Sequence, residues 1–117
     1  MRFEIWDSIS NFKFQTSNFK FVSMNIKILT PEYVVFEGEV DSVLLPGKNG
    51  EFHIMKNHAG IVSSLSFGKV KLFTKSVGEA YAKNFTKENE NQNEVFAYPI
   101  KSGVVEFNHD KGIILCE

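Results

Sequence analysis

Two histidines and a glutamate lie near one another in the sequence, and these residue types bind metal ions. Glu51 and His53 would share one face of a strand over residues 51–55, because side chains alternate along a strand, while His58 lies beyond the following turn. This spacing matches none of the recurrent zinc patterns. We therefore expect no metal site, and nothing in the sequence points to a cofactor.

Acid–base chemistry would need carboxylates, and three of them occupy alternate positions of one segment. Glu37, Glu39 and Asp41 would lie on the same face of a strand. Alternating charge of this kind is typical of the face that a half-buried strand turns to water. We expect a solvated face here and not a catalytic pair.

Hydroxyl and thiol nucleophiles are present, but they are not set in a catalytic arrangement. Ser63, Ser64 and Ser66 sit in no glycine-flanked elbow, and Cys116 stands next to the last residue. No glycine-rich loop that could cradle a phosphate is present either. A hydrolase would lack an assembled triad, so the sequence predicts a protein that is not an enzyme.

Short strands would position these groups, because apolar and polar residues alternate in brief segments separated by turn signals such as Pro46–Gly50. The expected strands are 25–29, 33–45, 51–55, 61–65, 69–72, 95–100, 103–107 and 112–115, with a polar hairpin turn at 108–111. Gly38 marks an expected bulge, and the polar stretch 75–93 is expected to form an exposed loop. Without intervening helices, the pattern predicts an all-β fold, an antiparallel sandwich or barrel.

Composition limits the function further. The 117 residues, 43% of them hydrophobic, suffice for one domain with one core. Because 13 basic and 14 acidic side chains nearly cancel, the chain has no positive field to hold a nucleic acid. No stretch approaches the roughly 18 apolar residues that span a bilayer, so no direct membrane insertion is expected. The single cysteine fits a reducing compartment. These observations indicate an interaction module.

Several short strings occur in an order that is similar to a known family. They are Leu29-Thr30-Pro31-Glu32, Val35-Phe36-Glu37-Gly38-Glu39-Val40, Leu45-Pro46-Gly47, Gly50-Glu51-Phe52, Asn57-His58-Ala59, Gly103-Val104-Val105-Glu106 and Ile114-Leu115-Cys116-Glu117. Each string is short, but their order and spacing extend over residues 24–117. In this range the chain resembles the amino-terminal β-sandwich domain of F-type ATP synthase epsilon subunits.

The resemblance implies an antiparallel β-sandwich of about ten strands and a non-catalytic rotor subunit. Members of this family bind the gamma subunit at the foot of the central stalk and rest against the polar loops of the membrane c-ring. They thereby couple ion-driven rotation to ATP synthesis. The implied location is peripheral, at the cytoplasmic face of the bacterial inner membrane.

Four residues match family positions at these contacts. Glu51 corresponds to the acidic residue that the family places against the polar loops of the c-ring, although a single exposed glutamate is otherwise only a solvated charge. Thr30, His58 and Ser63 correspond to positions on or near the surface that faces gamma. For His58 the alternative is a turn histidine bonded to nearby backbone, and both descriptions can hold.

The chain also departs from the family pattern. Gly60 stands where the family usually has proline, and Lys101-Ser102-Gly103 replaces a common Ser-Gly-Gly. The polar loop before Val95 is longer than usual. Family members typically continue into two carboxy-terminal helices, and we expect no such inhibitory hairpin here.

The first residues fall outside the resemblance. We expect residues 1–23 to be an unmatched N-terminal extension, disordered or the product of a mis-called start, and residues 24–117 to be the epsilon-type domain. A rival function is a sugar-binding sandwich, whose aromatic platform would come from Trp6 and the phenylalanines within 12–21.

Overall fold

A computed structural model describes residues 23–90 and 93–117 of the chain. The N-terminal extension predicted over residues 1–23 therefore lies outside the described residues, apart from Ser23. The aromatic platform of the rival sugar-binding function, Trp6 and residues 12–21, lies outside them as well.

The described residues form ten strands and one short helix. The strands are β1 (Met24–Leu29), β2 (Val34–Val40), β3 (Ser42–Gly47), β4 (Gly50–Met55), β5 (Ile61–Leu65), β6 (Gly68–Phe73), β7 (Thr86–Glu90), β8 (Asn93–Ile100), β9 (Gly103–Asn108) and β10 (Lys111–Cys116), and the helix is α1 (Glu79–Ala82). The prediction of an all-β fold with about ten strands is confirmed. Within the described ranges there is no helical hairpin.

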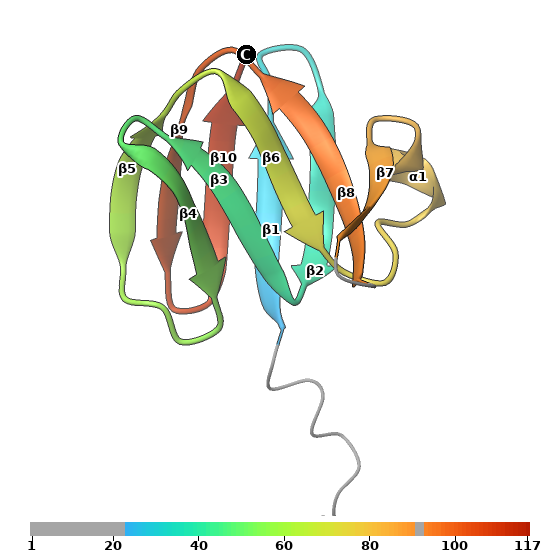
Figure 1. Ribbon diagram of the computed structural model, residues 1–117, viewed down its shortest axis with the longest axis horizontal. Coiled ribbons are helices and arrows are strands. Elements are labelled where there is room, and N and C mark those ends of the chain that lie inside the picture. Colours follow the sequence, from blue (N-terminus) through green and yellow to red (C-terminus); the bar gives the residue numbers. More distant parts are fainter. Residues whose placement is uncertain (1–22, 91–92) are drawn as a thin grey trace, which may run out of the picture.

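All ten strands belong to one hydrogen-bonded sheet that folds back on itself. Their order is β2-β1-β10-β9-β5-β3-β6-β8-β7, and β4 pairs with β3 off this path. Figure 1 shows the resulting sandwich, with β4, β3, β6, β8 and β7 in a front layer and β2, β1, β10, β9 and β5 in a back layer. The strand pairs are antiparallel, as predicted, except that β1 and β10 run parallel.

The core lies between the two layers, where every second side chain of most strands points inward. Its buried members are Met24, Ile26, Ile28, Val35, Phe36, Val40, Val43, Leu45, Ile54, Leu65, Val70, Leu72, Val77, Ile100, Val105, Phe107, Ile114 and Cys116. This apolar interior holds the loops at the two ends of the sandwich in fixed positions.

The segment predicted as one long strand over 33–45 is two strands. The chain leaves β2 at Asp41, whose backbone N–H donates to the Phe73 carbonyl at 2.9 Å, and enters the front layer as β3. Glu37, Glu39 and Asp41 are exposed, as predicted. A strand of 33–45 would have remained in one layer, so the break is needed to form the sandwich.

The bulge in β2 is at Val35 and not at Gly38. Ile28 pairs with Phe36 and Leu29 pairs with Val34, which leaves Val35 as the extra residue. Both Val35 and Phe36 are consequently buried.

The prediction of an exposed loop over 75–93 is wrong, because this stretch holds α1 and β7. Val77 is buried, and the rings of Tyr81 and Phe85 meet Phe36 edge-on at centroid distances of 5.6 and 6.0 Å. These few apolar residues pack against the core while the polar residues between them face water. They close one side of the sandwich between β2 and β8, here termed the closed seam (Figure 1).

The predicted polar turn between the last two strands is a two-residue hairpin loop. His109 and Asp110 both have positive φ, 51° and 60°, as the tight turns that suit twisted strands require. The Asp110 carboxylate accepts hydrogen bonds from the Asn57 backbone N–H at 2.8 Å and from Lys56 Nζ at 3.1 Å. These bonds tie the β4–β5 loop to the β9–β10 hairpin, and they lower the pKa of Asp110 below its usual value.

Candidate functional site

The outer face of the back layer carries a row of apolar side chains, of which Leu29 is half-buried and the others are exposed. Leu29 lies opposite Val34 on one side and Leu115 on the other, and Leu115 lies opposite Val104. Ile113 and Val62 follow in the next row, where both pair with Glu106. The residues Leu29, Val34, Val62, Val104, Ile113 and Leu115 are here termed the apolar strip. Val62 is 73% exposed and Leu115 is 49% exposed, so the part of the chain that the structure describes leaves this strip uncovered.

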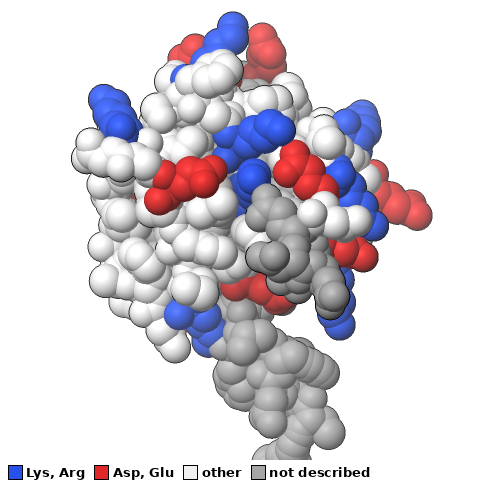
Figure 2. Space-filling model, in the orientation of Figure 1, with Lys and Arg blue, Asp and Glu red and all other residues white. Residues whose placement is uncertain are grey.

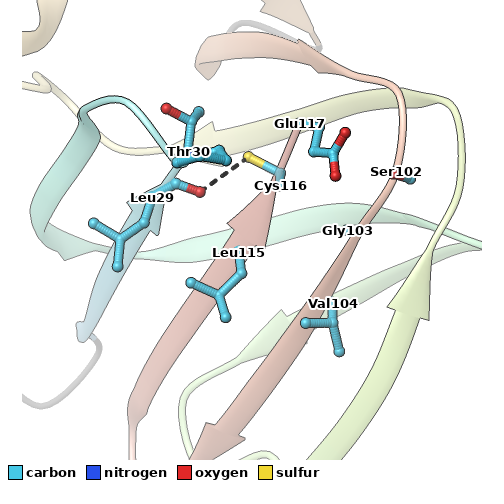
Figure 3. Close-up of a pocket in the computed structure, with 9 residues that line it drawn as sticks. Leu29, Thr30, Ser102, Gly103, Val104, Leu115, Cys116 and Glu117 are labelled. Carbon is cyan, nitrogen blue, oxygen red and sulfur yellow. Dashed lines mark hydrogen bonds between the residues drawn. The ribbon is translucent and has the colours of Figure 1, made fainter.

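A shallow groove of about 460 Å³ adjoins the strip at the end of the sandwich where the chain terminates. Figure 3 shows Leu29 and Thr30 on one side of this groove and Val104, Leu115 and Glu117 on the other. Thr30 Oγ1 accepts hydrogen bonds from the backbone N–H groups of Glu32 and Tyr33, at 3.2 and 3.1 Å. Thr30 therefore fixes the β1–β2 turn at the rim of the groove.

His58 lies at the opposite end of the sandwich from Thr30. Its Nδ1 atom donates to the Ala59 carbonyl at 2.7 Å, and its ring meets Phe107 edge-on at 6.2 Å. His58 is therefore a turn histidine bonded to nearby backbone, which is the alternative that the sequence leaves open for it. The side chain nevertheless stays exposed at the lower rim of the back layer.

Glu51 and Ser63 line a second groove, of about 520 Å³, between the β3–β4 hairpin and β5. The hairpin loop consists of Lys48 and Asn49 between two glycines. A Cβ atom on Gly47 would lie only 2.8 Å from the Gly50 carbonyl, and Gly50 has φ 120°, so both positions favour glycine. The hairpin presents the exposed Glu51 carboxylate beside β5. The side bounded by β4 and β5 is here termed the open seam.

The structure thus brings together only two of the four predicted contact residues. Glu51 and Ser63 line the same groove, whereas Thr30 and His58 lie at opposite ends of the back layer. The apolar strip lies at the Thr30 end of this face, and the exposed polar residues Asn108 and Lys111 lie between it and the His58 end. A surface that includes Thr30, His58 and Ser63 would include both the apolar strip and these polar residues.

The residues that suggested chemistry are held in structural contacts. His53 Nε2 shares a hydrogen bond of 2.8 Å with Ser42 Oγ, and its ring lies against Phe73. Burial raises the pKa of the Cys116 thiol, which lies 3.6 Å from the Leu29 carbonyl and is a poor nucleophile. Within residues 23–90 and 93–117, His, Cys, Asp and Glu form no group that could hold a metal ion.

The face of the front layer has a different character. Lys69 and Lys71 flank Glu88, with nitrogen–oxygen distances of 3.2 and 3.9 Å. Figure 2 shows blue and red side chains interspersed on this face, while the side on which Figure 1 places β4 and β5 carries few charges below the hairpin. No helix among the described residues is both long enough and apolar enough to cross a membrane.

The apolar strip was missed in the sequence, although a signal was available. Val104-Val105 and Ile113-Ile114-Leu115 place apolar side chains at both parities of their strands. Consecutive apolar residues in a strand indicate that both faces of the strand are buried against other parts of the protein or against a partner. The side chains of one face of β9 and β10 are buried in the core, and most side chains of the other face are exposed.

Comparison with known proteins shows the relationship. The family model of the ATP synthase delta/epsilon chain β-sandwich domain matches residues 23–83. The ATP synthase epsilon chain of Chlorobium limicola is 34% identical over 90 residues, which make up 77% of this chain and 84% of that protein. The ATP synthase epsilon chain of Campylobacter jejuni strain RM1221 is 51% identical over 45 residues, only 35% of that protein's length.

Two solved structures have a similar fold at low sequence identity. A chain of the Tetrahymena thermophila mitochondrial ATP synthase central stalk and c-ring has a TM-score of 0.57 and 13% identity, with 80% of this chain and 62% of that chain covered. A chain of the Euglena gracilis mitochondrial ATP synthase has a TM-score of 0.62 and 12% identity, with 89% and 65% covered. These two similarities support the fold alone.

The fold and its surface define a class of protein, a β-sandwich module whose described residues leave apolar side chains exposed on one face. The chain belongs to the ATP synthase delta/epsilon chain family, and its relatives are epsilon chains. The resemblance found in the sequence is confirmed. The prediction of a non-catalytic subunit is confirmed by the same relationship.

Proposed function

We propose that this chain is a central-stalk subunit of an F-type ATP synthase that links the gamma subunit to the c-ring. In this role it couples ion-driven rotation to ATP synthesis, at the cytoplasmic face of the bacterial inner membrane and peripheral to it. The apolar strip is the single observation that carries the proposal, because a monomer rarely exposes contiguous apolar side chains that no partner covers.

Gamma is the proposed partner of the apolar strip. Thr30 lies beside the strip, Ser63 lies on the strand that borders it, and His58 lies in the β4–β5 loop at the other end of the same layer. Apolar side chains at the centre and polar groups at the rim are the usual anatomy of a protein interface. The rotor needs a rigid connection, and the close-packed core behind the strip provides one.

The c-ring is the proposed partner of the β3–β4 hairpin. The tip of this hairpin exposes three polar residues. Lys48 and Asn49 form the loop, and Glu51 lies near the start of β4. Polar loops of a membrane ring would meet such a tip through hydrogen bonds and charge pairs, without insertion into the bilayer.

Co-purification with the gamma subunit of the same cell tests the first contact. The full chain should form a one-to-one complex, and the double variant His58→Asp, Ser63→Arg should weaken it. Absence of any complex with correctly folded wild-type protein would reject the proposed function.

The coupling between ATP hydrolysis and ion pumping in membrane-bound enzyme tests the second contact. Glu51→Lys should lower ATP-driven pumping per ATP hydrolysed, and Glu51→Asp, which keeps the charge, should pump like the wild type. Equal pumping by all three proteins would remove Glu51 from the c-ring contact.

A further inference from the structure

Among the described residues four strands have a free edge, β2, β4, β5 and β7, and the edges of β2 and β7 are protected against pairing with another chain. On β2 the bulge at Val35 interrupts the edge, and Asn84 Nδ2 donates to the Val35 carbonyl at 3.0 Å. On β7 the sequence Thr-Lys-Glu-Asn-Glu carries charge along the strand. Bulges and charges are the usual means by which proteins prevent edge-to-edge association. Both protected edges border the closed seam.

The edge of β5 in the open seam has none of these protections. Its sequence is Ile-Val-Ser-Ser-Leu, with no charge, proline, glycine or bulge. Along its whole length β5 pairs with β9, but on its other side the only pair among the described residues is Leu65 with Gly47 of β3. An uncharged strand rich in β-branched residues with a free edge is a template for strand pairing.

Hydrogen-bond geometry identifies the backbone groups that face this edge. The Ser66 N–H donates to the Pro46 carbonyl at 2.8 Å, across the Leu65–Gly47 pair. In an antiparallel ladder this bond makes Leu65 and Gly47 a non-hydrogen-bonded pair, so the backbone groups of Leu65 point to β9. The backbone N–H and C=O groups of successive residues point to opposite sides of a strand. The backbone groups of Ile61 and Ser63 therefore also point to β9. Val62 and Ser64 direct their N–H and C=O groups to the free edge, where the Ser64 carbonyl accepts a hydrogen bond of 3.2 Å from Ser63 Oγ.

The facing wall of the groove offers the same kind of group. Pro46 of β3 has no N–H, and it pairs with Glu51 of β4 next to the closing Gly47–Gly50 pair of the hairpin. The Glu51 pair is therefore non-hydrogen-bonded, and the backbone groups of Glu51 and His53 point away from β3. Both strands that border the open seam thus direct backbone groups into the groove, and within residues 23–90 and 93–117 these groups of Val62, Ser64, Glu51 and His53 pair with no other strand.

We propose that an extended segment of the gamma subunit adds to the free edge of β5 as a further strand of the back layer. This inference rests on the proposed function, because it states how gamma binds. Val62 belongs both to the apolar strip and to this edge, so the added strand would continue the surface proposed for gamma. Backbone hydrogen bonds would supply affinity, and apolar side chains at alternate positions would meet Val62 on one face and Phe52 on the other.

A single strand fits this groove better than a second copy of the same chain does. The β3–β4 hairpin stands beside the upper part of β5 and lines the groove with Gly47, Lys48 and Asn49. In a pair of identical chains joined through β5, each hairpin would meet the other chain's sheet at the same place. A slender segment avoids this contact.

Two substitutions at one position separate backbone from side-chain effects. Ser64→Pro removes an N–H that faces the free edge and leaves the ladder with β9 intact, a placement that edge strands tolerate. Ser64→Ala keeps the N–H and removes only the hydroxyl. Both full-length variants should fold, as judged by thermal melting. Ser64→Pro should bind gamma about tenfold or more weakly, and Ser64→Ala should bind within about twofold of the wild type.

The outcomes are distinguishable from a failure of the proposed function. If wild type and both variants bind gamma equally, gamma binding stands and strand addition is rejected. If gamma binds none of the folded proteins, the proposed function itself fails. If the wild type forms a dimer that Ser64→Pro abolishes while gamma affinity is unchanged, the edge pairs with a second copy and the inference is overturned.

Amide hydrogen exchange in the wild-type protein provides a test that needs no variant. In the free subunit the Val62 and Ser64 amides should exchange quickly, while those of Ile61 and Ser63 are protected by β9. On addition of gamma, exchange at Val62 and Ser64 should slow by about tenfold or more. Unchanged exchange at these two amides in a saturated complex would reject the inference.

Discussion

The two sides of this sandwich meet the same physical requirement in opposite ways. A two-layer sheet that does not close into a barrel leaves strand edges and inward-facing side chains exposed on both sides. In the closed seam the chain's own residues cover them, through α1, β7 and an aromatic cluster. In the open seam the described residues of β4 and β5 do not pair with each other, and a groove lies between the two strands.

The closed seam is covered by packing and by hydrogen bonds. Phe85 contacts Phe36, Phe96 and Tyr98 at ring-centroid distances of 6.0, 6.4 and 6.0 Å. Tyr33 and Tyr98 share a hydrogen bond of 2.9 Å between their hydroxyl groups. A comparable cluster is absent from the described residues of the open seam, where Phe52 is the aromatic residue that lines the groove. We infer from this difference that the closed seam contributes more to the stability of the fold. The open seam can therefore bind a partner without a loss of this stability.

Removal of one aromatic ring from each seam should give the largest contrast. Phe85 and Phe52 are both half-buried, so they form a matched pair. Phe85→Ala should lower the free energy of unfolding by about 2–4 kcal/mol, because it loses burial and three aromatic contacts. Phe52→Ala should cost about half as much. Urea titration measures both, and an equal or larger loss for Phe52→Ala would remove the contrast between the seams.

The hydrogen bond that protects the β2 edge should have the next largest effect. Asn84→Ala leaves the Val35 carbonyl without its donor and should cost about 1–2 kcal/mol. It should also promote association of the free subunit, because the edge of β2 is uncovered. Asn89→Ala on β7 is the control, since its side chain is exposed. Sedimentation and urea titration would contradict the account if the two variants behaved alike.

The closed seam should weaken at alkaline pH. Burial, followed by the hydrogen bond with Tyr33, raises the pKa of Tyr98 above its ordinary value. The neutral phenol is favoured in the folded state, so its stabilisation is complete below about pH 10, the unfolded pKa, and declines as pH rises above it. Unfolding free energies should therefore fall between pH 10 and roughly pH 11.5 more steeply in wild type than in Tyr98→Phe. If the unfolding free energies of the two proteins changed with pH in parallel, ionisation of Tyr98 would not be the cause of the alkaline destabilisation.

The smallest effect is expected at the lower end of the open seam. The Asn57 backbone N–H, and after it Lys56, lower the pKa of Asp110, so its stabilisation is present above about pH 4 and is lost as pH falls further. Asp110→Asn should lower the melting temperature slightly at pH 7, and the difference from wild type should shrink at pH 3. Lys56→Met should reproduce only part of this change, because the backbone bond remains. A difference that grew at acid pH would contradict the assignment.

Parts of the fold that depend on alternation were predictable from the sequence. Ile26 and Ile28, or Val105 and Phe107, alternate with polar residues, and they are buried as that pattern requires. Pro46–Gly50 and the 108–111 segment have the residues that tight turns need, and both are hairpin turns. Local residue chemistry determines these features, so no knowledge of the tertiary structure was needed.

Other features depend on contacts between distant segments. Tyr81 and Phe85 are isolated among polar residues, and only the presence of Phe36 and Tyr98 across the seam makes them core residues. The split at Asp41 depends on the Phe73 carbonyl of another strand. The groove that joins Glu51 to Ser63 forms because the β3–β4 hairpin lies beside β5. Single-sequence patterns carry none of this long-range information.

The affinity of the full chain for the gamma subunit, measured for two charge-introducing variants, tests the central claim most directly. Leu115→Lys places a charge in the apolar strip, and Glu79→Lys changes an exposed residue of α1 at the closed seam. Our account predicts that Leu115→Lys weakens gamma binding by about tenfold or more, as loss of an interface anchor does, while Glu79→Lys binds like the wild type. Wild-type affinity in Leu115→Lys, with both variants folded, would show that gamma does not bind the apolar strip.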